Sequence, residues 1–193
     1  MDLVQPADSS ARLSVRTEAR STPASNPSPL EAEVKLLFDE LRVPVLRYLM
    51  TLGLSPPDAD EVVQDVFLAL FQHLRRGKPR SNLPGWVFRV AHNLALKRRH
   101  ANRSGETVLA DAGDAAGHLD AAPNPEEQAV QRQRQARLLA VVRALPEQDR
   151  CCLHLRAEGL RYREIAKVLG VSLGAVSLSL QRALARLTRA DGY

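Results

Sequence analysis

The segment 83–100, LPGWVFRVAHNLALKRRH, places side chains that can bind nucleic acid at regular intervals. On a helix, Arg89, Asn93 and Lys97 lie one turn apart on a stripe separate from the apolar one. Guanidinium and ammonium groups bind phosphates, and an amide binds base edges. A helix face that only contacts solvent does not require this combination of groups. Arg98 and its neighbours extend the positive charge. The stripe therefore predicts a nucleic-acid contact.

Trp86, the only tryptophan of the chain, lies at the entrance to this segment beside a Gly/Pro/Asn loop. It fits two roles equally well. One is ordinary core packing, and the other is a surface on which unpaired bases stack.

Residues 58–74, DADEVVQDVFLALFQHL, have one apolar and one acidic helical face. The apolar face comprises Val62, Val63, Val66, Phe67, Leu70 and Leu74. The acidic face comprises Asp60, Glu61, Gln64 and Asp65. Charge alone favours a solvated face over a docking surface for a basic partner.

The last segment predicts a helix-turn-helix, made of LRYREIAKVLG, a tight turn and VSLGAVSLSLQRALARL. Gly159 and Gly170 stand where helices end, and Ser172 caps the last helix. The predicted core residues are Ile165, Ala166, Leu169, Val171, Val176 and Leu180. On the last helix the core stripe comprises Val176, Leu180, Ala183, Leu184 and Leu187. The opposite, reading face comprises Gly174, Leu178, Gln181, Arg182, Ala185 and Arg189. Helix-turn-helix geometry also occurs outside DNA binding, and the pattern alone favours DNA binding over those other uses.

The titratable residues do not form a catalytic or metal-binding constellation in the sequence. Cys151 and Cys152 are adjacent, which disfavours a disulfide between them and favours core packing. The five histidines have no evident nucleophile partner or metal-ligand spacing. We therefore expect no enzyme, no catalytic residue, no metal and no cofactor. No secretory signal or membrane-length apolar run is evident, so we expect a reduced, cytoplasmic protein without membrane insertion.

Composition and periodicity predict an all-α fold of two small helical domains joined by a flexible linker. Residues 1–29 lack periodicity and are expected to be a disordered tail. Residues 30–103 are net +4 and predict helices at 31–52, 58–75 and 84–101, with a kink or boundary at Pro44. Residues 104–124 are net −4 and form the expected linker. Residues 125–193 are net +5, and their first helix should run to Ala144 with Asn124 as its cap.

Three blocks in this order resemble a known family. They are DADEVVQDVFLALFQHL, WVFRVAHNLALKRR and LPEQDRCCLHLRAEGLRYREIAKVLGVSLGAVSLSLQRALARL. Together they are similar to bacterial RNA polymerase sigma factors of the sigma-70 family, in the small two-domain extracytoplasmic-function (ECF) subfamily. The resemblance covers about residues 31–101 and 126–189, and it implies a promoter-specificity subunit that starts transcription.

The resemblance also implies partners and roles. The acidic face (Asp60, Glu61, Gln64, Asp65) would bind the β′ clamp helices of core RNA polymerase, with the β flap as a further contact. The residues expected at the −10 element of promoter DNA are Asn82, Trp86, Arg89, Asn93, Lys97 and Arg98, with the loop 78–85 reading a flipped base. Those expected at the −35 element are Arg161, Arg163, Lys167, Ser172, Ala175, Leu178, Gln181 and Arg182. The acidic linker would thread towards the RNA exit path and active-site channel. Most relatives of this type are controlled by an anti-sigma factor, and the sequence does not reveal whether this chain is.

The last helix departs from the family pattern, which commonly has a lysine and an arginine in its first half. From Ser172 to Gln181 the chain has no positive charge. We therefore expect −35 contact to depend on shape, on Ala175 and Leu178 against thymine methyls, and on Gln181 against adenine. Two other functions compete: a DNA-binding regulator that uses the last domain alone, and a pure interaction protein. The regulator leaves segments 58–74 and 83–100 unexplained, and the Arg–Asn–Lys stripe argues against the interaction protein.

Overall fold

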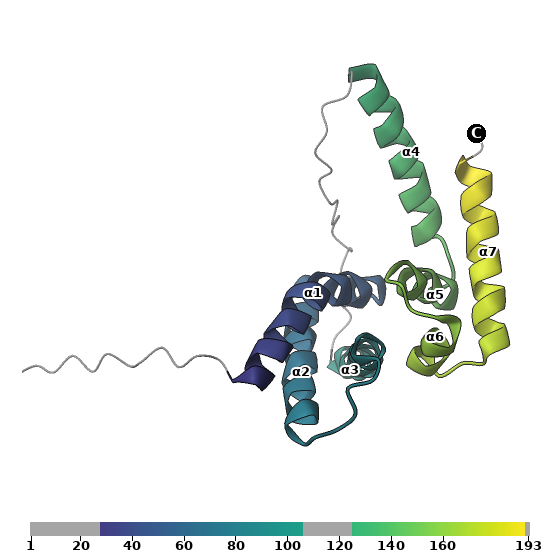
Figure 1. The fold of residues 1–193 in the computed structure, drawn as a ribbon. Coiled ribbons are helices and arrows are strands. Elements are labelled where there is room, and N and C mark those ends of the chain that lie inside the picture. Colours follow the sequence, from purple (N-terminus) through teal and green to yellow (C-terminus); the bar gives the residue numbers. More distant parts are fainter. Residues whose placement is uncertain (1–27, 106–124, 192–193) are drawn as a thin grey trace, which may run out of the picture.

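The computed structural model describes residues 28–105 and 125–191 of the 193-residue chain. All regular structure in these two ranges is α-helical, as the sequence predicts. The helices are α1 (Pro29–Thr51), α2 (Pro56–Arg75), α3 (Leu83–Gly105), α4 (Pro125–Arg143), α5 (Glu147–Ala157), α6 (Tyr162–Leu169) and α7 (Leu173–Asp191). Figure 1 shows that α1–α3 form an N-terminal unit and that α4–α7 form a C-terminal unit.

Helix α1 begins with a capping box that the sequence prediction did not include. The Ser28 backbone N–H donates to Glu31 Oε2 at 2.8 Å, and the Glu31 N–H donates to Ser28 Oγ at 3.2 Å. Residues 28 and 29, predicted as tail, therefore belong to the helix and its cap, and the rest of the predicted tail lies outside the described residues. Pro44 does not end the helix. Figure 1 shows α1 changing direction along its length, as expected where proline removes a backbone hydrogen bond.

Helices α2 and α3 pack on α1 through the stripes that the sequence predicts. All six predicted core residues of α2 are at most 6% exposed. Val87 and Ala91 of α3 are buried, and Val90 and Leu94 pack partly buried against the same core.

Helix α3 is longer than predicted, since it continues to Gly105. Asn102 Nδ2 donates to Asp58 Oδ2 at 3.1 Å, which ties the last turns of α3 to the start of α2. The first two residues of the predicted linker are therefore helical. Residues 106–124, with the remaining linker and the predicted cap Asn124, lie outside the described residues.

Helices α5, α6 and α7 form the predicted helix-turn-helix unit. Gly159 and Gly170 have φ values of 87° and 67°, the left-handed region that favours glycine after a helix. The Ala175 N–H donates to Ser172 Oγ at 3.1 Å, so Ser172 caps α7 as predicted. Helices α6 and α7 meet at 104°, within the usual range for this motif. The predicted core is confirmed, with Ile165, Val176 and Leu180 fully buried and Ala166, Leu169 and Val171 packed partly buried against it.

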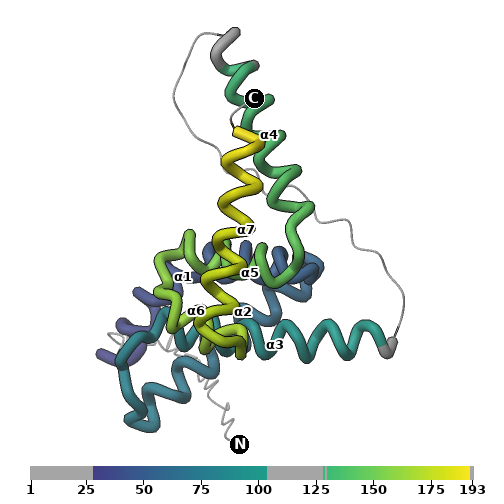
Figure 2. Tube along the Cα trace, turned by 90° about the vertical axis from the view of Figure 1, so that its right-hand side faces the viewer, coloured from purple at the N-terminus to yellow at the C-terminus, as the bar shows by residue number. Residues whose placement is uncertain are grey.

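The prediction for the lower half of α7 is wrong at one residue. Leu184, assigned to the core stripe, is 53% exposed, whereas Ala183 is buried. In Figures 1 and 2, α7 and α4 project together beyond α5 and α6. Ala183 at the same level is buried and Leu187 one turn on is partly buried, so Leu184 lies on the side of α7 that no neighbouring helix covers.

The two units also pack on each other, which the sequence pattern does not predict. Helix α3 lies against α6, and α1 lies against α5. Buried residues of both units form one continuous core, in which Tyr48 and Phe88 join Cys151 and Leu155. Both cysteines are buried and unbonded, as the sequence predicts. In the described part of the chain, no single helix is long and apolar enough to cross a membrane, although the bent pair α6–α7 passes on length and composition.

Candidate nucleic-acid and protein-docking interfaces

The acidic face of α2 is open to solvent. Glu61, Gln64 and Asp65 are exposed, and Asp60 is partly exposed while pairing with Arg42 at 3.5 Å. Leu68 follows Gln64 by one turn and is 57% exposed. An apolar side chain beside carboxylates suits a protein partner better than a purely solvated face. Sequence reasoning missed Leu68, although its i+4 spacing from Gln64 was a usable signal.

Arg98 joins this acidic face to α3. Its Nε donates to Asp58 Oδ1 at 2.8 Å, and its Nη2 donates to Glu61. Hydrogen bonds from Ser55, and then from Arg98 and Asn102, hold the pKa of Asp58 below its usual value. The hydrogen bonds to Asp58 and Glu61 raise the pKa of Arg98. A residue predicted for DNA and one predicted for polymerase thus bind each other in the free chain.

The stripe of Arg89, Asn93 and Lys97 is fully available. All three side chains are exposed on α3, and none forms an ion pair with another residue of the described ranges. Their apolar neighbours Val87 and Ala91 face the core, which fixes the stripe outward. This arrangement leaves two cations and an amide free to bind phosphates and base edges.

Asn82 has a structural role in addition to the predicted contact. It has φ 55° and caps α3, because its Oδ1 accepts from the Gly85 N–H at 3.2 Å. A Cβ at position 85 would lie 2.4 Å from Asn82 Nδ2, so a larger residue there would displace the Asn82 side chain from its capping position. The amide stays exposed on the loop between α2 and α3.

Trp86 packs rather than protrudes. It lies partly buried against the core, and its ring centroid is 4.6 Å from that of His73. His73 Nε2 in turn lies 3.1 Å from the Pro79 carbonyl oxygen, within hydrogen-bond distance. Trp86 and His73 therefore hold the loop that carries Asn82, which favours the packing role of the two that the sequence left open.

The reading face of α7 is exposed and carries little charge. Leu178 is 52% exposed, Gln181 is exposed, and Ala175 is partly buried. The cations predicted beside it, Arg161, Arg163 and Lys167, are exposed on and before α6. The helix-turn-helix thus has a neutral centre and a basic flank.

Arg182 differs from the other predicted −35 residues. It forms a bidentate pair with Asp149, with Nε–Oδ2 at 3.0 Å and Nη2–Oδ1 at 2.6 Å, and it also donates to Ser179 Oγ at 3.2 Å. Asp149 and Ser179 are 0% exposed. The Arg182 guanidinium is the main reason that the pKa of Asp149 lies below its usual value. Arg182 therefore joins α5 to α7. Sequence reasoning missed Asp149, since nothing local marks a partner 33 residues away.

The described ranges contain no candidate metal site. No group of three potential ligands among histidine, cysteine, aspartate and glutamate occurs in residues 28–105 and 125–191. Burial raises the pKa of Cys151 to about 12 and also raises that of Cys152, so both thiols stay protonated at neutral pH.

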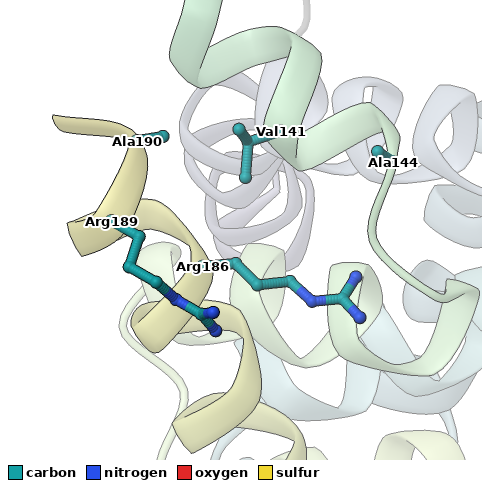
Figure 3. A pocket seen from close by; sticks show the side chains of 5 residues that line it. All are labelled: Val141, Ala144, Arg186, Arg189 and Ala190. Carbon is teal, nitrogen blue, oxygen red and sulfur yellow. The ribbon is translucent and has the colours of Figure 1, made fainter. Parts of the chain in front are cut away.

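A groove lies between α4 and α7. Its lining comprises Val141, Ala144, Arg186, Arg189 and Ala190. Figure 3 shows the Arg186 side chain extending across from α7 towards the α4 side, with Arg189 on the same helix. The groove combines apolar walls with two cations.

Two family models match the chain. The model described as Sigma-70 region 2 matches residues 37–104, which contain the acidic face and the Arg–Asn–Lys stripe. The model described as Sigma-70, region 4 matches residues 135–187, which contain the helix-turn-helix.

Curated proteins give the same result. The RNA polymerase sigma factor CnrH of Cupriavidus metallidurans is 32% identical over 142 residues, covering 70% of this chain and 74% of CnrH. The ECF RNA polymerase sigma factor RpoE of Cereibacter sphaeroides is 28% identical, and the match covers 81% of this chain and 85% of RpoE. The probable RNA polymerase sigma factor RfaY of Xanthomonas campestris is 35% identical over 66% of this chain, and the match spans about a third (32%) of its own length.

Solved structures share the fold. CnrH in complex with the cytosolic domain of CnrY superposes with a TM-score of 0.53 and 23% identity, covering 82% of this chain and 86% of CnrH. The sigma factor RpoE in complex with the anti-sigma factor NepR from Bartonella quintana superposes with a TM-score of 0.55 and 20% identity. The superposition covers 81% of this chain and 96% of that RpoE chain.

Proposed function

The chain belongs to the sigma-70 family of RNA polymerase sigma factors and is similar to its ECF members, and we propose that it is a promoter-specificity subunit. In this role it recruits core polymerase and starts transcription. The observation that carries this proposal is the pairing of two open surfaces within the region 2 match. An acidic face lies on α2, and an Arg–Asn–Lys stripe lies on the adjacent α3.

The acidic face of α2 docks on the β′ clamp helices of core polymerase. Asp60, Glu61 and Asp65 supply negative charge for a basic partner, and Gln64 supplies an amide. Leu68 adds exposed apolar area at the C-terminal end of this face. The C-terminal unit makes a second contact, with the β flap.

The α3 helix and the loop before it bind the −10 element. Arg89 and Lys97 pair with phosphates, and Asn93 reaches base edges. Asn82 presents its amide to a flipped base from a backbone position fixed by the helix cap. Trp86 supports the loop from beneath, and Arg98 reaches DNA only when it leaves Asp58 and Glu61.

The helix-turn-helix binds the −35 element. Arg161, Arg163 and Lys167 hold the phosphate backbone. Ser172 caps the reading helix, and Ala175, Leu178 and Gln181 read bases through methyl and amide contacts. Arg182 keeps α7 in place through Asp149 and adds positive charge to the reading face.

Two further aspects follow from family membership. Two solved relatives are bound to CnrY and to the anti-sigma factor NepR, so we expect an anti-sigma factor to bind this chain as well. The chain itself catalyses no reaction, and the chemistry of transcription resides in core polymerase. A regulator acting through the last unit alone is not favoured, because it leaves the region 2 match without a role.

Core docking is tested with the triple variant Asp60→Lys, Glu61→Lys and Asp65→Lys. The variant gives α2 the same positive charge as the β′ surface that it is proposed to bind. Binding to purified core polymerase should therefore fall at least about 100-fold. Binding is measured by biolayer interferometry, and circular dichroism checks that helix content is kept. The control is Asp39→Lys, a reversal on α1, where the ion pair of Asp39 among residues 28–105 and 125–191 is with Lys35, four residues away. If the triple variant binds core polymerase as the control does, the docking surface lies elsewhere.

A further inference from the structure

The loop between α2 and α3 (residues 76–82, the α2–α3 loop) is exposed along its whole length. Its first residues are bonded to the end of α2. The Gly77 N–H donates to the Leu74 carbonyl oxygen at 3.0 Å. Gly77 has φ 65°, the left-handed conformation in which glycine commonly ends a helix. Since exposed loops are usually mobile, the contacts beyond Gly77 decide the shape of this one.

Two of these contacts come from the adjoining helices. His73 Nε2 of α2 lies 3.1 Å from the Pro79 carbonyl oxygen, within hydrogen-bond distance. Asn82 ends the loop, and its Oδ1 accepts from the Gly85 N–H of α3 at 3.2 Å. The Asn82 carbonyl oxygen accepts from the Trp86 N–H at 3.1 Å. The middle of the loop is therefore bonded to α2, and its end is bonded to α3.

The third contact comes from α1, a helix far from the loop in sequence. Arg80 Nε donates to both carboxylate oxygens of Glu33, at 3.1 and 3.2 Å. The Arg80 side chain is 55% exposed and that of Glu33 is 33% exposed, so water screens the pair only in part. Within residues 28–105 and 125–191, no other hydrogen bond or ion pair joins the loop to α1.

A carboxylate at this place opposes DNA binding if only charge matters. Arg75, Arg76, Lys78 and Arg80 bring four positive charges to the end of α2 and the loop, and such charges attract phosphates. Glu33 offsets the charge of Arg80 and repels any phosphate that comes near. A loop that bound DNA through charge alone would bind more tightly without Glu33. The favourable effect of Glu33 is therefore on the geometry of the loop.

Arg80 lies close enough to Asn82 to control where the Asn82 amide points. Two residues of extended chain span at most about 7 Å, so a fixed Arg80 leaves Asn82 little room to move. On its other side Asn82 is tied to Gly85 through the α3 cap. A side chain that is already in place when a base arrives loses less conformational freedom on binding and holds a narrower range of geometries.

We propose that Glu33 and Arg80 are positioning residues that hold the α2–α3 loop in the shape that selects the base flipped from the −10 element. Their role rests on the proposed function, because Asn82 binds that base in the same complex. Glu33 does not touch DNA and acts through Arg80, as His73 acts through Pro79. Helix α1 thus contributes to promoter selectivity although it carries none of the predicted DNA contacts.

Limited digestion with trypsin tests the anchoring of the loop in the chain alone. The Arg76–Gly77 bond lies in the loop, and trypsin cleaves it when the loop opens. Glu33→Ala should raise the initial cleavage rate at this bond about two- to fivefold, while circular dichroism shows unchanged helix content. Glu40→Ala is the matched control on α1, since Glu40 is exposed and forms no ion pair within the described ranges. It should leave the cleavage rate unchanged.

Base selection is measured by fluorescence anisotropy with holoenzyme assembled from purified core polymerase and the chain. The probes are the non-template strand of a −10 element mapped by run-off transcription, and the same strand with an abasic site at each position in turn. The position whose abasic penalty disappears in Asn82→Ala is the base at the loop. At that position, the ratio of intact to abasic affinity should fall about two- to fivefold in Glu33→Ala.

A conservative variant separates geometry from charge. Glu33→Gln and Glu33→Ala remove the same negative charge, but only glutamine keeps an oxygen that accepts from Arg80 Nε. Glu33→Gln should therefore retain more of the affinity ratio than Glu33→Ala, and Glu40→Ala should retain all of it. If charge is the only effect of Glu33, both variants instead bind intact and abasic strands more tightly and by equal factors.

Three results would overturn the positioning role. One is an unchanged cleavage rate at Arg76–Gly77 in Glu33→Ala, and another is an unchanged affinity ratio in that variant. The third is an equal change in affinity for intact and abasic strands. Because the digestion uses the chain without polymerase or DNA, a failed transcription assay would refute the proposed function while the anchoring of the loop is measured separately.

Discussion

The ion pair between Arg182 and Asp149 predicts that Arg182, which lies on the DNA-reading helix, mainly stabilises the fold. Asp149 is fully buried, and Arg182 supplies both of its charge-assisted hydrogen bonds from a side chain that is 45% exposed. Truncating Arg182 removes both of these hydrogen bonds and leaves the Asp149 carboxylate with the Ser179 hydroxyl and whatever water enters. We therefore expect Arg182→Ala to lower the free energy of unfolding clearly more than truncation of a neighbouring arginine that has no carboxylate partner.

Urea denaturation followed by circular dichroism measures this effect. Arg186→Ala, one turn further along α7, is the control, since Arg186 forms no ion pair within the described ranges. Its cost should stay within about 0.5 kcal/mol. In an Asp149→Asn background, Arg182→Ala should destabilise the fold less than it does in the unmodified chain, because no buried carboxylate remains.

The pH dependence of the same variant has a fixed sign. The pKa of Asp149 is lowered in the folded chain, so the pair stabilises the fold above the ordinary carboxyl pKa of about 4. The stability difference between the unmodified chain and Arg182→Ala should therefore be complete at pH 7 and shrink below about pH 4. If Arg182→Ala is as mild as Arg186→Ala at pH 7 and instead abolishes −35 binding, Arg182 is a DNA contact and the structural argument fails.

Three other predictions concern the promoter-facing surfaces. Gly85→Ala places a Cβ 2.4 Å from Asn82 Nδ2 and displaces the α3 cap, so urea denaturation should show a loss of about 1 kcal/mol; an unchanged midpoint would show that the cap is dispensable. Arg89→Ala removes one phosphate-pairing cation, so the slope of log affinity for the promoter against log salt concentration should become shallower by about one. Both Arg89→Ala and Asn93→Ala should reduce promoter opening, detected with permanganate, more than they reduce affinity for core polymerase. Equal losses in opening and in core affinity would argue against DNA contact. Leu178→Ala should leave stability within about 0.5 kcal/mol, since Leu178 is 52% exposed, yet weaken binding to a −35 duplex roughly fivefold; unchanged binding would remove Leu178 from the reading face.

The parts of this structure that the sequence predicts are those decided by contacts within one helix or one turn. The two faces of α2 follow from residue spacing alone, and the turn at Gly170 follows from the left-handed conformation that glycine adopts there. The exposure of Leu184 could not be predicted, since it depends on which side of α7 the other helices cover.

Ion pairs between residues far apart in the chain also could not be predicted from the sequence. Arg98 and Arg182 look like free cations on helix faces, but Asp58 and Asp149 bind them from 40 and 33 residues away. The packing of α3 on α6 joins segments on either side of the linker, and no local pattern records it. Both kinds of contact change how a predicted site residue is interpreted.

The central claim is that this chain directs core RNA polymerase to promoters, and run-off transcription tests it most directly. Purified core polymerase is incubated with the chain and a library of genomic fragments from the source organism, and transcript start sites are mapped. Discrete starts downstream of shared −35 and −10 sequences are predicted, and they should disappear with the Asp60→Lys, Glu61→Lys and Asp65→Lys variant. Absence of any chain-dependent transcript, together with absence of binding to core polymerase, would contradict the claim.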